Sequence, residues 1–179
     1  MSPAEEAPVH IVPYEPVWPA LFELKRQLLS RTLRSWIIGP IEHVGSTAVL
    51  GLPAKPVIDI MAPVESLDAS REALAVLRDL EYQYAPYRAD VMHWFCKPSP
   101  SFRTHHLHLV PYRGLLWTER IVFRDCLRSD PVVAREYAEL KHRLAEVHRF
   151  DREAYTEAKG PFISRVLQNL IVERRETET

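Results

Sequence analysis

The segment from Ile41 to Ile60 constrains the fold of this chain more than any other. Its first residues, to Val44, are typical of a short strand, and Gly45-Ser46-Thr47 is typical of a tight corner with free backbone N–H groups and two hydroxyls that can face an anion. The apolar run Val57 to Ile60 indicates a second strand. Asp59 lies inside this run, where an ionised carboxylate is costly unless a metal, a cation or hydrogen bonds compensate. We therefore expect the corner and Asp59 to form two walls of one site.

The length and charge of the chain limit what surrounds this segment. With 179 residues, 46% of them hydrophobic, the chain can form one substantial core but not two ordinary domains. We expect a disordered N-terminus over 1–8, a single domain over 9–172 and a frayed tail over 173–179. The 23 basic and 24 acidic residues give a net charge of −1, so there is no global field that would hold the chain to nucleic acid or to an anionic membrane.

The sequence carries no signal for export or for membrane insertion. No window approaches the roughly 18 apolar residues that a spanning helix requires, and Glu5 and Glu6 stand where a secretion signal would be basic. Cys96 and Cys126 are far apart and lack the spacing of a zinc site, so we expect buried, reduced thiols. These features predict a cytoplasmic protein, and they leave its oligomeric state open.

Strands are followed by helices along the rest of the chain. Trp18 is expected to anchor a helix that begins near Pro19. The strands expected after Asp59 are short and lie at 82–84, 91–97 and 105–110. Helical periodicity then covers 117–128, 132–147 and 151–172. Gly160-Pro161 should kink or restart the last helix, because proline removes a backbone donor. We expect these helices to cap a small mixed sheet.

A second group of polar residues lies on the strand at 105–110. Residues two apart share a face of a strand, so His106 and His108 project together, while His105 points the other way and is expected at the surface. Two aligned imidazoles suit metal ligation, proton transfer or phosphate binding, and the alternative is that they form hydrogen bonds within the protein. A histidine-triad hydrolase would need a third imidazole where Val110 stands, which excludes that class.

The whole pattern resembles the signature of the GrpB family, which is assigned to the nucleotidyltransferase superfamily. The residues that carry the resemblance are Tyr14, Trp18, Gly45-Ser46-Thr47-Ala48-Val49, Gly51-Leu52, Ala54-Lys55-Pro56, Ile58-Asp59-Ile60, His106-Leu107-His108, Phe123-Arg124-Asp125, Tyr137, Leu140-Lys141, Tyr155 and Lys159. It covers nearly the whole chain. It implies an α/β (α+β) fold of nucleotidyltransferase type, a small mixed sheet with flanking helices and a helical C-terminal cap. Members of the family are also found joined to dephospho-CoA kinase.

One part of the usual transferase site is missing. Nucleotidyltransferases hold Mg²⁺ with two acids on alternate residues of the second strand, so that both carboxylates face the nucleotide phosphates. The alternate position after Asp59 is Met61, whose thioether does not bind Mg²⁺. At least half of the metal clamp is therefore absent from this strand.

Three interpretations stay open. In the first, Asp59 with Glu42, His106 or His108 makes an altered metal site for Mg²⁺, ranked ahead of Mn²⁺ and Zn²⁺; for a zinc site, His43 is a further candidate ligand. In the second, no metal binds, and cations hold a nucleotide or another phosphorylated small molecule. The candidate cations are Lys55, Arg103, Arg124, Lys141 and Lys159. In the third, the site is degenerate and the domain is an accessory module, as the fusions to dephospho-CoA kinase suggest.

Whether the chain is an enzyme is left open. In an enzyme, Asp59, His108 and Lys55 would be the catalytic residues, with Gly45, Ser46 and Thr47 at the phosphates and Lys55 or Arg103 at the leaving group. Several of these positions also have a simpler interpretation. Lys141 and Lys159 are surface lysines by default, and Arg124, Asp125 and Arg128 form a helical stripe on which charge is normally solvated.

Overall fold

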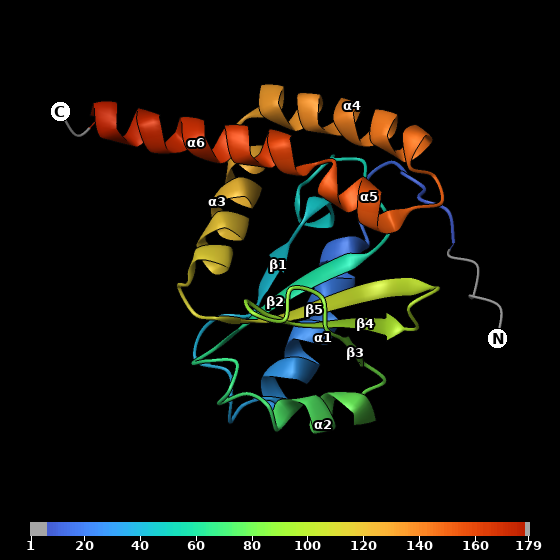
Figure 1. Cartoon of the computed structure of the whole chain (residues 1–179), viewed down its shortest axis with the longest axis vertical. Helices are drawn as coiled ribbons and strands as arrows, with labels where there is room; N and C mark the ends of the chain where they lie inside the picture. Colours follow the sequence, from blue (N-terminus) through green and yellow to red (C-terminus); the bar gives the residue numbers. More distant parts are fainter. Residues whose placement is uncertain (1–6, 178–179) are drawn as a thin grey trace.

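One mixed sheet of five strands organises the fold, seen in a computed structural model that describes residues 7–177 (Figure 1). The strands are β1 (Glu42–Val44), β2 (Ile58–Val64), β3 (Gln83–Ala85), β4 (His93–Pro98) and β5 (Arg103–Pro111), in the spatial order β1-β2-β5-β4-β3. β2 and β5 run parallel in the middle, and the other neighbouring pairs are antiparallel. The prediction of a small mixed sheet with flanking helices is confirmed.

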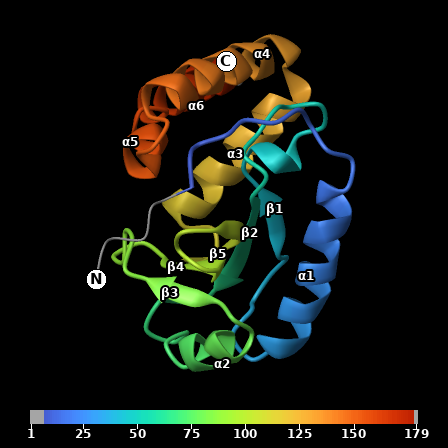
Figure 2. The same ribbon diagram turned by 90° about the vertical axis from the view of Figure 1, so that its right-hand side faces the viewer.

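Helices cover both faces of the sheet (Figure 2). One face is covered by α1 (Trp18–Thr32) and α2 (Ala73–Asp79). The other face is covered by α3 (Leu115–Ser129), which leads into α4 (Pro131–Val147), α5 (Arg152–Glu157) and α6 (Gly160–Thr177). Trp18 is 2% exposed in the hydrophobic core between the sheet and these two helices, α1 and α2, as expected of an anchor. Both cysteines are buried thiols, as expected.

Alternation along the two central strands divides their side chains between the two cores. Ile58 and Ile60 of β2 pack with Leu107 and Leu109 of β5 against α1 and α2. Met61 lies on the opposite face, in the core that includes α3. Because side chains alternate along a strand, Asp59 on β2 and the two histidines at 106 and 108 also face α3. The apolar pattern of these strands therefore directs the polar residues to one side of the sheet.

The C-terminal helices form the expected cap. Asp130 accepts hydrogen bonds from the backbone N–H groups of Val132 and Val133, and Pro131 occupies the first turn, so α4 begins sharply after α3. α5 ends at Glu157 and α6 begins at Gly160, which is the expected restart. α6 continues to Thr177, beyond the expected end at 172. Most of the N-terminal segment expected to be disordered, residues 1–6, lies outside the described residues.

Candidate functional site

The corner after β1 brings the backbone against Asp59. β1 and β2 pair with Val44 opposite Asp59, and the chain then turns through Gly45 at a φ of 72° into the short 3-10 helix η1 (Ser46–Ala48). A φ in this range strongly favours glycine. A Cβ atom on Gly45 would lie 2.6 Å from Oδ2 of Asp59, so the missing side chain also makes room for the carboxylate. The corner and the acid are adjacent walls of one cavity.

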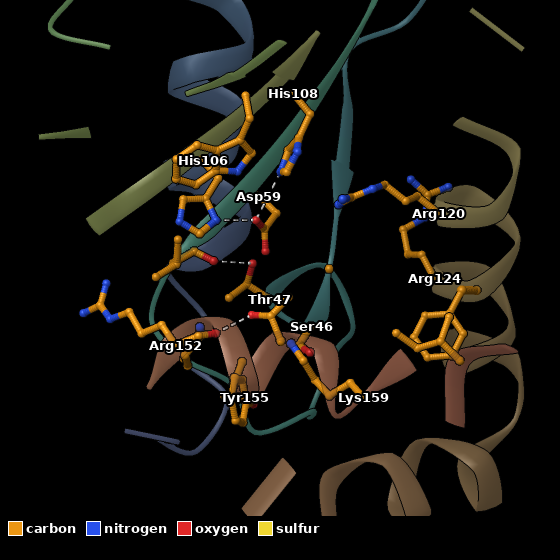
Figure 3. A pocket seen from close by; sticks show the side chains of 18 of the residues that line it. Ser46, Thr47, Asp59, His106, His108, Arg120, Arg124, Arg152, Tyr155 and Lys159 are labelled. Carbon is orange, nitrogen blue, oxygen red and sulfur yellow. Dashed lines mark hydrogen bonds and ion pairs between the residues drawn. The ribbon is translucent and has the colours of Figure 1, made fainter. Parts of the chain in front are cut away.

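Asp59 and the paired histidines form a close cluster (Figure 3). The parallel register places Asp59 beside His106 and Met61 beside His108. Nδ1 of His106 lies 2.9 Å from Oδ1 of Asp59, and Nε2 of His108 lies 3.5 Å from the same oxygen. One potential metal-binding atom from each of the three residues lies within 4.8 Å of the others. His105, expected at the surface, is instead half-buried on the other face, with Nδ1 2.9 Å from the hydroxyl of Thr104.

Burial and the contacts between its members together set the charges of this cluster. Burial would raise the pKa of Asp59, but the hydrogen bonds and charges of His106 and His108 outweigh that effect and hold the pKa well below its usual range. Burial lowers the pKa of His108 to about 4, and it also lowers the pKa of His106. At neutral pH the cluster is therefore one carboxylate with two neutral imidazoles.

The cluster opens on a cavity of about 410 Å³ between the sheet and the C-terminal helices. The five cations expected from the sequence all line it: Lys55, Arg103, Arg124, Lys141 and Lys159. Three further basic side chains that the sequence reasoning missed join them: Arg88, Arg120 and Arg152. The acidic side chains of the lining are Asp59, Glu119 and Glu153. The cavity is therefore rich in positive charge although the chain as a whole is nearly neutral.

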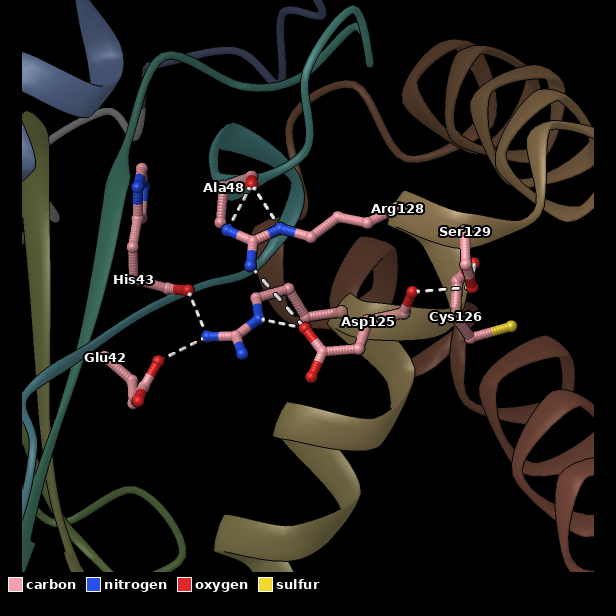
Figure 4. Close-up of polar contacts among 8 residues, drawn as sticks. Glu42, His43, Ala48, Asp125, Cys126, Arg128 and Ser129 are labelled. Carbon is pink, nitrogen blue, oxygen red and sulfur yellow. Dashed lines mark hydrogen bonds and ion pairs between the residues drawn. The ribbon is translucent and has the colours of Figure 1, made fainter.

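Arg124 is a structural residue at the back of this cavity, and its expected place on a solvated stripe is wrong because it is 8% exposed. Its guanidinium donates to Glu42 at 2.6 Å, to Asp125 at 2.8 Å and to the carbonyl of His43 at 3.1 Å. Arg128 donates two hydrogen bonds to the carbonyl of Ala48 (Figure 4). These contacts fasten α3 to β1 and the corner. Glu42, expected as a possible metal ligand, is paired with Arg124 and is not part of the Asp59 cluster.

The threonine hydroxyl of the corner is engaged within the protein. Thr47 is 2% exposed, donates to the carbonyl of Val57 at 3.2 Å and lies 3.0 Å from Nε2 of His43. His43 is stacked on Phe22 and is not part of the metal-type cluster. Ser46 lies beside the hydroxyl of Tyr137 and acts to lower the pKa of that tyrosine, although burial raises the pKa overall. Thr47 therefore shapes the corner, and Ser46 lines the cavity beside it.

The lysines of the cap are not surface residues. Lys141 is 1% exposed, and its ammonium donates to the carbonyl of Pro53. Lys159 is half-buried, with Nζ 4.5 Å from the ring centre of Tyr155, which also lies 4.8 Å from Nζ of Lys55. Burial lowers the pKa of each of Lys141 and Lys159 to about 7. Their default interpretation as solvated lysines is wrong because α4, α5 and α6 fold back over the corner.

Arg120 lines the cavity although no motif in the sequence marks it as a site residue. It is half-buried on α3, one turn before Arg124, and faces the cavity (Figure 3). It forms no hydrogen bond or ion pair with the residues that the structure describes, and burial lowers its pKa although Asp59 acts in the opposite direction. The spacing of four residues from Arg124 places both on one side of a helix, which was the available signal. Arg103 differs, since its guanidinium lies over Trp94 at 5.2 Å.

The sheet order and the helical cap define a protein of α/β (α+β) class with a small mixed sheet and a basic cavity around an acid. The chain belongs to the GrpB family, whose model, described as GrpB protein, matches residues 8–169. It is 39% identical to a UPF0157 protein of Pseudomonas aeruginosa, over 97% of this chain and 72% of the relative. It is 35% identical to the glutamate-rich protein GrpB of Alkalihalophilus pseudofirmus, over 90% of this chain and 95% of the relative.

A solved structure shares the architecture. The crystal structure of the conserved protein GrpB from Enterococcus faecalis superposes with a TM-score of 0.81 at 28% identity, covering 92% of this chain and 99% of that chain. A protein named dephospho-CoA kinase from Mycolicibacterium paratuberculosis is 30% identical over 87% of this chain, which corresponds to 44% of that protein. None of the described helices is long and apolar enough to cross a membrane.

Proposed function

We propose that this protein binds a nucleotide or another phosphorylated small molecule in the cavity between the sheet and the C-terminal helices. The observation that carries this proposal is the charge of the lining, in which eight basic side chains accompany three acidic ones. Arg120 and Lys159 form no ion pair with any described residue. Burying such cations without counter-ions is costly, and a polyanionic ligand would remove that cost.

The lining offers different places for phosphate and for a base. Arg120 on α3 and Lys159 before α6 face the cavity near Asp59 and Ser46, where phosphate oxygens would be bound. Tyr87 also lines the cavity, is 39% exposed and lies edge-on to Trp94 with 6.2 Å between the ring centres. A ring with this exposure provides a stacking surface for a nucleobase. The same cavity thus suits both parts of a nucleotide.

Calorimetric titration of the full chain with ATP, AMP, pyrophosphate and phosphate, in the presence of a chelator, tests the proposal. Lys159→Met and Arg120→Met should each weaken binding of pyrophosphate about 10- to 100-fold, because each removes a charge-assisted contact. Arg165→Met is the control, since Arg165 is exposed and pairs with Glu136 away from the cavity. Tyr87→Ala should weaken ATP but leave pyrophosphate unchanged. Absence of binding at millimolar ligand, or equal effects in all variants, would contradict the proposal.

A non-catalytic accessory module is the second candidate. It is favoured by the relative named dephospho-CoA kinase, in which the matched segment is less than half of a longer protein. Met61, buried in the sheet where a second acid would complete the usual Mg²⁺ clamp, points the same way. Release of pyrophosphate from a bound nucleoside triphosphate separates the two candidates. Turnover that Asp59→Asn abolishes supports nucleotidyl transfer, whereas binding without turnover supports the module.

A further inference from the structure

The contacts of His108 pose a chemical problem that hydrogen bonding within the protein does not solve. His108 is 3% exposed, with Nδ1 3.4 Å from the sulfur of Met92 and Nε2 3.5 Å from Oδ1 of Asp59. A thioether sulfur and an ionised carboxylate oxygen are both acceptors. A neutral imidazole carries a single N–H, so one of its nitrogens must direct a lone pair at another lone pair. A cation between His108 and Asp59 removes this conflict.

Neighbouring atoms in the cluster are spaced like ligands of one metal ion. Donor atoms that share a metal at roughly 2.0–2.1 Å lie about 3 Å apart. Two of the three separations match this spacing, because the imidazole nitrogens lie 2.9 Å and 3.5 Å from Oδ1 of Asp59. The three donor atoms all lie within 4.8 Å of one another, so a small inward movement of the imidazoles would complete the coordination. A metal bound to Nε2 of His108 leaves Nδ1 with its proton, which then points at the sulfur of Met92. Both contacts of His108 become favourable.

The donor set selects the kind of metal. Two imidazole nitrogens and one carboxylate oxygen suit Zn²⁺, Co²⁺, Mn²⁺ or Fe²⁺, whereas Mg²⁺ prefers oxygen ligands and keeps several waters. The site therefore does not fit the Mg²⁺ that a nucleotidyltransferase would use. Three protein ligands also leave coordination positions open, as in catalytic sites and not in closed structural ones.

We propose that Asp59, His106 and His108 bind one divalent transition-metal ion whose open positions face the basic cavity. The carboxylate and the two imidazoles come from the two central strands of the sheet, whose parallel register places them side by side. A phosphoryl oxygen of the ligand, placed by Arg120 and Lys159, would fill an open position. That last link rests on the proposed function, while the metal site itself does not depend on it.

Metal titration of the full chain tests this proposal without any phosphorylated ligand. After dialysis against a chelator, ZnCl₂, CoCl₂ and MgCl₂ are titrated separately by calorimetry, and the Co²⁺ complex is followed by its visible absorption. One equivalent of Zn²⁺ or Co²⁺ should bind per chain, and Mg²⁺ should not compete at the same concentration. Asp59→Asn and His106→Gln should each weaken binding of Zn²⁺ at least about 100-fold. Loss of a residue that binds the metal directly should cost more than loss of a residue that only hydrogen-bonds to such a ligand. His43→Gln is the matched control, because it changes a buried histidine outside the cluster.

The outcomes separate the two proposals. Unchanged Zn²⁺ affinity in Asp59→Asn and His106→Gln, no stoichiometric binding to the wild type, or tighter binding of Mg²⁺ overturns the metal site. If the variants unfold, ¹⁵N spectra of the wild-type histidines decide. Zn²⁺ must shift two buried imidazoles, and shifts confined to the exposed His10 and His142 overturn the proposal. Failure of pyrophosphate to bind both the chelator-treated and the Zn²⁺-loaded protein would count against the proposed function alone.

Discussion

Gly45 and Asp59 are in such close contact that a methyl group added to Gly45 would clash with the carboxylate. The added carbon would lie 2.6 Å from Oδ2 of Asp59. Contacts this short do not occur between real side chains, so the backbone or the carboxylate would have to move. The φ of 72° at Gly45 adds a second requirement for glycine. The glycine of the sequence signature is therefore explained by the acid that follows it fourteen residues later in the sequence.

Gly45→Ala is expected to destabilise the protein by roughly 2–4 kcal/mol, because it combines backbone strain with a clash. Gly51→Ala is the matched control. Gly51 has a similar φ of 77°, but an added Cβ would meet nothing within 4 Å. Urea unfolding should place Gly51→Ala at roughly 1 kcal/mol, the strain alone. Equal losses for the two variants would show that the approach of Asp59 is unimportant.

Arg124→Met should cost about 3 kcal/mol in the free energy of unfolding, because Glu42 and the carbonyl of His43 lose a buried partner. Arg165→Met should change it by no more than about 0.5 kcal/mol, since its ion pair with Glu136 is exposed. Chemical denaturation of both variants at one pH provides the measurement. A small effect at Arg124 would mean that α3 is held to the corner by apolar packing alone.

Acid should destabilise the protein through His43. Burial lowers its pKa from 6.5 to about 4, with Asp59 acting in the raising direction and Arg128 and Arg124 in the lowering one. The unfolded chain therefore takes up a proton first, so stability is present above pH 6.5 and is lost as the pH falls towards 4. His43 should account for roughly 2 kcal/mol between pH 7.5 and 5. Urea unfolding at the two pH values should show that His43→Gln loses about 2 kcal/mol less free energy of unfolding than the wild type. Equal losses in the two proteins would argue against this role of His43.

Lys159 should make ligand binding sensitive to pH. Burial and the neighbouring Lys55 lower its pKa to about 7, whereas a bound phosphate would raise the pKa again. Binding therefore takes up a proton above pH 7, and pyrophosphate affinity should fall by up to about tenfold per pH unit between 7 and 9. Lys159→Met should flatten this dependence.

In the unbound protein, the same lysine should give the free energy of unfolding a pH dependence opposite to that of ligand affinity. Its unfolded state holds the proton more tightly, so the free energy of unfolding should rise with pH from about 7 towards 10.5, by at most about 1.4 kcal/mol per pH unit. Urea unfolding of the wild type and of Lys159→Met at pH 7 and 9 measures this. Identical slopes in the two proteins would show that Lys159 titrates normally.

The pairing of the histidines and the restart at Gly160 were predictable because each follows from local rules. The period of two along a strand put His106 and His108 on one face, and proline chemistry divided α5 from α6. The direction in which those imidazoles point, towards Asp59, required only that two apolar strands lie side by side.

The buried cations were not predictable in the same way. A helical pattern tells which residues share a side, but not which other element will cover that side. Arg124 and Lys141 are buried because α3 and α4 dock on the corner and on the carbonyl of Pro53, contacts that join residues more than eighty positions apart. Such docking depends on the complete tertiary arrangement.

Leu107 and Leu109 do not line the candidate site, yet their burial determines which face of the sheet the imidazoles occupy. Both are fully buried against α1 and α2, and a slip of β5 by one residue would exchange them with their neighbours. The imidazoles would then be buried in the hydrophobic core against α1 and α2, and the leucines would face the arginines of the cavity. A screen for loss of function should therefore find inactivating changes at these silent aliphatic positions as readily as at the polar ones.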